Sequence, residues 1–110
     1  MKTLTPQEER ILEMFKRAVR QQYPTEVSEI RVFGSSARGD ATDESDIDVL
    51  VVTNSDDWRL GDAIRRFGYD LDADIGCKLS IQVLPVTHMR YLAENQFSFY
   101  RHVARDGISL

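Results

Sequence analysis

Two aspartates and a glycine-serine pair are the residues of this chain whose types and spacing suggest chemistry. Gly34 and Ser35 end one apolar run, and after ten further residues Asp46 and Asp48 open a second apolar run. Alternate side chains of an extended strand share a face, so the two carboxylates are expected to point the same way, about 6–7 Å apart along the backbone. Paired carboxylates attract a hard cation such as Mg²⁺, and a glycine-containing bend lets the backbone approach phosphate closely. The pattern therefore predicts a metal site beside a phosphate site, as nucleotide chemistry requires.

Strands are expected to position these residues. A first strand is predicted around residues 30–33, directly before the glycine-serine pair. Residues 47–52 form a continuous apolar run, which is typical of a strand buried on both faces. A third strand is predicted at residues 79–83, where apolar and polar residues alternate until Pro85 stops the pattern. The two aspartates would then lie at the start of the most deeply buried strand.

A long helix is predicted before the first strand. Thr5 is a suitable cap, Pro6 fits the first helical position, and Glu8 completes a capping box. Apolar residues then recur at helical spacing until Pro24 ends the helix.

Further helices are predicted after the second strand. The polar cluster at residues 54–57 is a turn and helix cap, and apolar residues then recur every three or four positions over residues 60–75, with Gly68 tolerated inside the helix. Two short helices are expected at residues 87–94 and 98–106. This order of elements indicates an α/β or α+β fold, a small mixed sheet backed by helices.

Length and charge narrow the classes of function. With 110 residues the chain is expected to form one domain spanning residues 1–110. Fourteen basic and eighteen acidic residues give a net charge of −4. A general nucleic-acid binder needs a dense basic face to displace counterions, so no direct nucleic-acid binding is expected. A small nucleotide that carries its own magnesium has no such requirement.

The cellular location is also an expectation from composition. Cys77 is the only cysteine, which excludes an intrachain disulfide and fits a reducing, cytoplasmic environment. The sequence shows no secretory signal at its start and no apolar run near the roughly 20 residues that span a bilayer, so no membrane attachment is expected.

The residues of the motif resemble a known family. Gly34-Ser35 followed by ten residues and Asp46-Ile47-Asp48 resembles the signature of the polymerase-β nucleotidyltransferase superfamily. The longer strings Gly-Ser-Ser-Ala-Arg-Gly-Asp-Ala and Ser-Asp-Ile-Asp are similar to the minimal nucleotidyltransferases of bacteria and archaea. These are small single-domain proteins, often the antitoxin partners of HEPN-domain ribonuclease toxins.

The resemblance implies a polymerase-β-like nucleotidyltransferase fold and a role for each motif residue. Gly34 and Ser35 would contact the triphosphate of ATP, and Asp46 and Asp48 would be the catalytic metal ligands for Mg²⁺. Arg38 would either donate two hydrogen bonds to a phosphate or pair with the acidic residues of its own loop. The implied reaction transfers AMP from ATP to a hydroxyl of a partner protein, and the implied partner is a HEPN toxin.

The chain departs from the family pattern at one position. Active members usually carry a third acidic residue on a neighbouring strand, where it helps to hold the metal that activates the attacking hydroxyl. Here the outward positions of that strand are Ser80 and Gln82, and neither is a carboxylate. The sequence is therefore compatible with two functions. The protein is either an active adenylyltransferase or an antitoxin that neutralises a toxin by binding alone. An antibiotic-modifying transferase shares the motif, but it needs additional sequence to hold the drug.

The remaining residues are weaker candidates for a site. His88 and His102 have no companion Cys or His at zinc-site spacing, so no zinc site is expected, and His102 is expected on the surface. Phe97, Phe99 and Tyr100 are expected in the core or in a subunit contact, which leaves oligomerisation possible.

Overall fold

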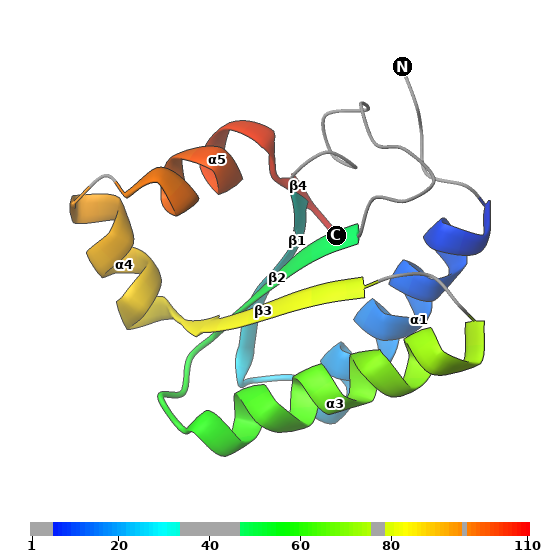
Figure 1. The fold of residues 1–110 in the computed structure, drawn as a ribbon. Helices are drawn as coiled ribbons and strands as arrows, with labels where there is room; N and C mark the ends of the chain where they lie inside the picture. The colour runs from blue at the N-terminus through cyan, green and yellow to red at the C-terminus, as the bar shows by residue number, and fades with distance from the viewer. Residues whose placement is uncertain (1–5, 34–46, 76–78, 96) are drawn as a thin grey trace.

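The computed structural model describes residues 6–33, 47–75, 79–95 and 97–110. Its elements, in chain order, are α1 (Pro6–Gln22), β1 (Val27–Phe33), β2 (Ile47–Thr53), α3 (Trp58–Ile75), β3 (Leu79–Pro85), α4 (Val86–Glu94), α5 (Ser98–Asp106) and β4 (Ile108–Ser109) (Figure 1). The predicted mixed sheet with helices is confirmed.

The sheet has the strand order β3-β2-β1-β4. β2 pairs parallel with β3 and antiparallel with β1, and β4 pairs antiparallel with β1. β2 therefore lies inside the sheet, with a hydrogen-bonded neighbour on each side. This placement explains why its sequence is almost entirely apolar.

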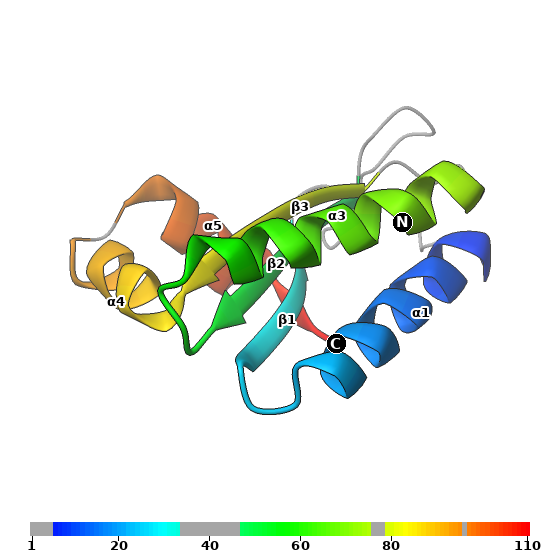
Figure 2. The same cartoon turned by 90° about the horizontal axis from the view of Figure 1, so that it is seen from below.

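Helices cover both faces of the sheet. α1 and α3 pack side by side on one face, and the shorter α4 and α5 lie on the other (Figures 1 and 2). Alternate residues of β2 divide between two apolar clusters, one on each face. Ile47, Val49 and Val51 belong to the cluster under α1 and α3, whereas Leu50 and Val52 belong to the cluster under α4 and α5. The prediction that this strand is buried on both faces is confirmed.

The larger cluster depends on a close approach between α1, α3 and the sheet. Phe15 of α1 is fully buried there. A Cβ placed on Gly68 of α3 would lie 2.1 Å from the Cδ1 atom of Ile81 and 3.0 Å from the Cε1 atom of Phe15. Real Cβ atoms do not come as close to another heavy atom as the first of these distances, so any side chain at residue 68 would force the end of the Ile81 side chain to move. The sequence pattern merely tolerated this glycine, whereas the structure shows that the packed helix leaves little room for a larger residue.

The polar cluster before α3 forms the predicted helix cap. The Asp57 carboxylate accepts a hydrogen bond from the backbone N–H of Arg59 at 3.0 Å and another from its side-chain Nε at 3.1 Å. Both hydrogen bonds lower the pKa of the Asp57 carboxyl below its usual value, and the backbone bond has the larger effect. Such bonds satisfy a backbone donor that the first turn of a helix leaves unpaired.

The end of the chain adds an element that the sequence pattern does not predict. After α5, Gly107 donates its N–H to the Val103 carbonyl at 2.7 Å and takes an extended conformation with φ −67°. The chain then runs along β1 as β4, and Leu110 donates its N–H to the Ile30 carbonyl at 2.9 Å.

None of the described helices combines the length and apolar character needed to cross a membrane.

Candidate functional site

Asp48 is the predicted site residue that the structure describes. It is the second residue of β2, where its cross-strand partners are Phe33 of β1 and Ser80 of β3. It is half-buried and takes part in an interaction there. Because side chains alternate along a strand, Asp48 shares the face of Leu50 and Val52, which α4 and α5 cover in part.

The two ends of the predicted motif meet at this point of the sheet. Phe33 is the last residue of β1, and the glycine-serine pair follows it in the sequence. Phe33 and Asp48 are direct partners in the antiparallel ladder, so the segment predicted to hold phosphate begins beside the predicted metal ligand. Gly34, Ser35, Arg38 and Asp46 lie outside the described residues, and their roles stay predictions.

The neighbouring strand presents neutral side chains to this site. Ser80 is the ladder partner of Asp48 and is half-buried, and Gln82 is the partner of Leu50 and is exposed. The strand contains no carboxylate from Leu79 to Pro85. The prediction that Ser80 and Gln82 occupy the positions beside the aspartate strand is therefore confirmed.

The donor chemistry at this site suits a hard cation. The described part of the site offers a carboxylate from Asp48 and a hydroxyl from Ser80 on the adjacent strand. Mg²⁺ prefers such oxygen donors, whereas zinc and copper sites favour imidazole or thiolate. Within the described ranges no three His, Cys, Asp or Glu residues gather into a metal-binding group. A magnesium ion here would thus depend on Asp46 as well as Asp48.

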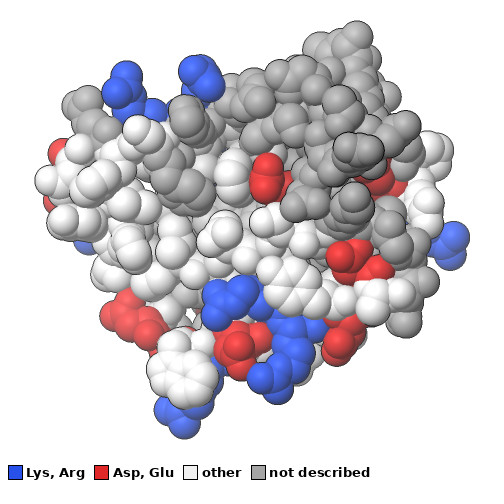
Figure 3. All heavy atoms as spheres, viewed as in Figure 1, with Lys and Arg blue, Asp and Glu red and all other residues white. Residues whose placement is uncertain are grey.

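Charged side chains of both signs mix on one face of the molecule. In the view of Figure 3, blue and red side chains lie together over α3, and the described surface next to them is mostly white. Arg66 pairs with Asp62 at 2.8 Å, and Arg59 pairs with Asp57 at 3.1 Å. The positive charges of these two arginines are therefore compensated locally.

An exposed aromatic cluster lies at the α4–α5 connection. The ring centroids of Tyr91 and Phe97 are 5.8 Å apart, and those of His88 and Tyr91 are 6.5 Å apart. Tyr91 and Phe97 are 55% and 45% exposed, so Phe97 is not a core residue. Tyr100 is half-buried, and the side chains of Phe99 and His102, like the whole of Cys77, lie outside what the structure describes.

A cavity that the sequence does not indicate lies on the same sheet face as Asp48. It has a volume of about 440 Å³ and lies between the sheet and the α4–α5 pair. No periodic pattern in the sequence points to it, because its lining residues come from β1, β2, α4 and α5. We refer to this cavity as the α4–α5 groove.

Comparisons with known proteins agree with this architecture. The family model described as "Nucleotidyltransferase domain" matches residues 12–101. Two relatives from Methanocaldococcus jannaschii are named "Putative protein adenylyltransferase", MJ0604 and MJ1379. The first is 31% identical over 102 residues, covering 91% of this chain and 94% of the relative. The second is 31% identical over 96 residues, covering 86% and 92%.

Solved structures show the same fold. A protein from Sulfolobus solfataricus described as a "putative nucleotidyltransferase" superposes with a TM-score of 0.59 at 20% identity, covering 91% of this chain and 76% of that one. A "putative minimal nucleotidyltransferase" superposes with a TM-score of 0.60 at 24% identity, covering 93% and 94%. Since the family model spans most of the chain and two relatives are 31% identical over most of their length, the protein belongs to the nucleotidyltransferase domain family and has the fold of a minimal nucleotidyltransferase.

Proposed function

We propose that this protein is a magnesium-dependent adenylyltransferase that transfers AMP from ATP to a hydroxyl of a partner protein in the cytoplasm. The observation that carries the proposal is the pairing of Asp48 with Phe33, the residue that precedes the glycine-serine pair. The names of the two Methanocaldococcus relatives support a protein as the acceptor. The resemblance to minimal nucleotidyltransferases favours a HEPN toxin as that partner, so the transfer would serve an antitoxin role.

The motif residues divide the work of the reaction between them. Gly34 and Ser35 would hold the triphosphate through backbone N–H groups, with Arg38 as a further donor where it is not paired to its own loop. Asp46 and Asp48 would hold Mg²⁺ through their carboxylate oxygens. When bound, the metal would neutralise negative charge that develops on the α-phosphate as pyrophosphate leaves.

The acceptor hydroxyl must lose its proton as its oxygen bonds to the α-phosphorus and the bond to pyrophosphate breaks. Ser80 is placed beside Asp48 and can hydrogen-bond, but a serine hydroxyl does not take up a proton at neutral pH. Gln82, one position further along the same face, is also no base. Neither side chain of β3 facing this site therefore takes the proton, and a motif carboxylate is the general base that we propose.

Labelling with ATP carrying ³²P at the α-phosphate tests this function. With magnesium and a purified HEPN partner, the wild-type protein is expected to label the partner, and Asp48→Asn to reduce labelling by about 100-fold or more. Asp62→Asn is the matched control, since Asp62 is an α3 surface acid paired with Arg66. Absence of labelled partner, or equal labelling by Asp48→Asn, would contradict the proposal.

A second function is favoured by one observation, the neutral Ser80 beside Asp48. In this alternative the protein neutralises the toxin by occupying its surface, without transferring AMP. The double variant Asp46→Ala with Asp48→Ala separates the two functions. A binding-only antitoxin would still co-purify with the toxin and protect cells, whereas an adenylyltransferase would lose protection.

A further inference from the structure

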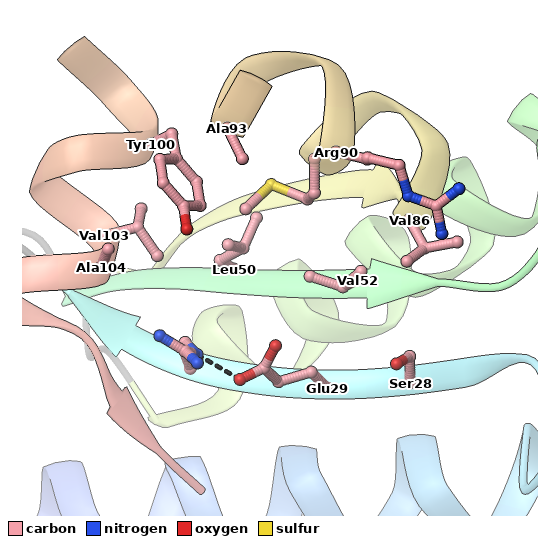
Figure 4. A pocket seen from close by; sticks show the side chains of 12 residues that line it. Ser28, Glu29, Leu50, Val52, Val86, Arg90, Ala93, Tyr100, Val103 and Ala104 are labelled. Atoms are coloured by element: carbon pink, nitrogen blue, oxygen red, sulfur yellow. Dashed lines mark hydrogen bonds and ion pairs between the residues drawn. The ribbon is translucent and has the colours of Figure 1, made fainter. Parts of the chain in front are cut away.

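The α4–α5 groove has the size of a small-molecule site. Its volume of about 440 Å³ lies within the range of roughly 300–1,000 Å³ typical of such sites. Three sides are formed by protein, namely the sheet below, α4 along one wall and α5 at one end (Figure 4). The residues that the argument uses are Leu50, Val52, Met89, Arg90, Tyr100 and Val103.

The part of the groove floor that β2 forms is apolar. Leu50 and Val52 of β2 and Val103 of α5 form one buried cluster, and Met89 of α4 packs against it. Among the residues that the structure describes, no charged side chain belongs to this cluster. An apolar or aromatic body placed on this floor would lose contact with water, and this burial favours binding.

The charge of the groove comes from two arginines and one glutamate in the described part of the chain. The Arg31 Nε donates to the Glu29 carboxylate, and both side chains are about one-third exposed (Figure 4). The Arg31 Cδ atom also lies within 3.3 Å of the position that a Cβ on Gly107 would take. Glu29 therefore compensates the charge of Arg31.

Arg90 supplies the remaining charge. The structure gives this side chain no hydrogen bond or ion pair with any residue that it describes. Figure 4 shows its guanidinium beside Val86, at the end of the groove away from Val103 and Ala104. A cation without a described counter-charge next to an apolar floor matches a ligand with one negative charge and an apolar body, and a planar carboxylate fits a guanidinium best.

α5 closes the groove at the end where β2 begins. At this end the groove is lined by three residues of α5, namely Tyr100, Val103 and Ala104 (Figure 4). The hydroxyl of Tyr100 points toward the sheet. Asp48, Ser80 and their ladder partner Phe33 do not line the groove. The groove is thus a second site on the same face, not an extension of the predicted metal site.

We propose that the α4–α5 groove binds a small amphipathic monocarboxylate. Its apolar body lies on Leu50, Val52 and Met89, and its carboxylate accepts two hydrogen bonds from Arg90. The Tyr100 hydroxyl is available to a polar substituent at the closed end. A polyphosphate is disfavoured because Glu29 stands at the same groove and, of the described arginines that line it, Arg90 alone remains to meet the charge.

Methyl-detected NMR titration tests the proposal with two matched probes, phenylacetate and its neutral analogue phenylacetamide. In the wild-type protein, both are expected to shift the methyl signals of Leu50, Val52 and Met89, with phenylacetate binding about tenfold more tightly. Arg90→Gln is expected to lower the affinity for phenylacetate to that for the amide. Arg17→Gln on α1, an exposed arginine of the opposite layer, is the control and should change neither affinity.

Two further measurements complete the test. Ala93→Trp, which fills the groove from α4, is expected to abolish binding of both probes, and a thermal melt checks that the variant folds. ATP without metal is expected to leave the phenylacetate shifts unchanged, since Asp48, the described residue of the predicted nucleotide site, does not line the groove. Equal affinities for acid and amide, an unchanged affinity in Arg90→Gln, or displacement by ATP would each overturn the proposal. Arg90 is exposed, so its variant retains the test even if Ala93→Trp unfolds.

Discussion

The two faces of the sheet are built from the same strands but have opposite character. The face under α1 and α3 carries the larger apolar cluster, and these two helices of 17 and 18 residues cover it. The other face carries Asp48, Ser80 and the ion pair of Arg31 with Glu29, and its helices have only nine residues each. Long helices can bury a whole face, whereas short ones leave polar side chains reachable. The first face stabilises the domain, and the second is available for chemistry.

The largest expected effect comes from removing a buried side chain under α1 and α3, which tests whether that face of the sheet stabilises the domain. Phe15→Ala removes a fully buried ring and is expected to cost about 3–5 kcal/mol of unfolding free energy. That is a large part of the roughly 5–15 kcal/mol that domains usually possess. Denaturant unfolding measures the loss, and Met14→Ala at an exposed neighbouring position should stay within about 0.5 kcal/mol.

A change on the other face should separate activity from stability. Asp48→Asn is expected to reduce AMP transfer by about 100-fold or more while changing the unfolding free energy by about 1 kcal/mol or less, because the amide keeps the shape of the carboxylate. Transfer assays and denaturant unfolding on the same preparation check both numbers. A variant that unfolds like Phe15→Ala would show that the polar face is also structural.

The contact between α3 and the sheet offers a smaller test. Gly68→Ala places a methyl group where the Ile81 side chain lies, so Ile81 and Phe15 must shift. Overpacking of this kind costs about 1–3 kcal/mol even though alanine is the better helix former. Gly61→Ala is the matched control, since its nearest neighbour would be an ordinary 3.4 Å away. An equal stability change in both variants would contradict the close approach at residue 68.

The smallest expected effect is a gain in metal affinity at Asp48. Ser80→Asp places a carboxylate beside Asp48 on the neighbouring strand and is expected to raise metal affinity about tenfold by adding charge and an oxygen ligand. Titration with Mn²⁺ followed by electron paramagnetic resonance measures this directly. Gln82→Glu, one position further along the same face from Asp48, should give a weaker gain. If neither variant changes Mn²⁺ affinity, Asp48 does not belong to a metal site.

Features with a local cause could be predicted from the sequence. The helix of α1, the cap at Asp57 and the end of β3 at Pro85 depend on residues that are neighbours along the chain. The double-sided burial of β2 follows from an apolar run without alternation. The alternation of apolar and polar residues along β3 likewise predicts that Ser80 and Gln82 share a face, whereas the family resemblance was needed to predict that this strand lies beside the aspartate strand.

Features that join distant segments could not be predicted in this way. β4 has only two residues, too few for any periodicity, and it exists because the end of the chain meets β1. The lack of room for a side chain at residue 68 arises from Ile81 and Phe15, which lie on other elements. The net charge of the groove likewise depends on two elements. Glu29 pairs with Arg31 on β1, and this leaves Arg90 of α4 without that counter-charge. A repeating pattern records the environment of one element, whereas close approach and charge balance depend on which elements meet, and only the tertiary structure settles that.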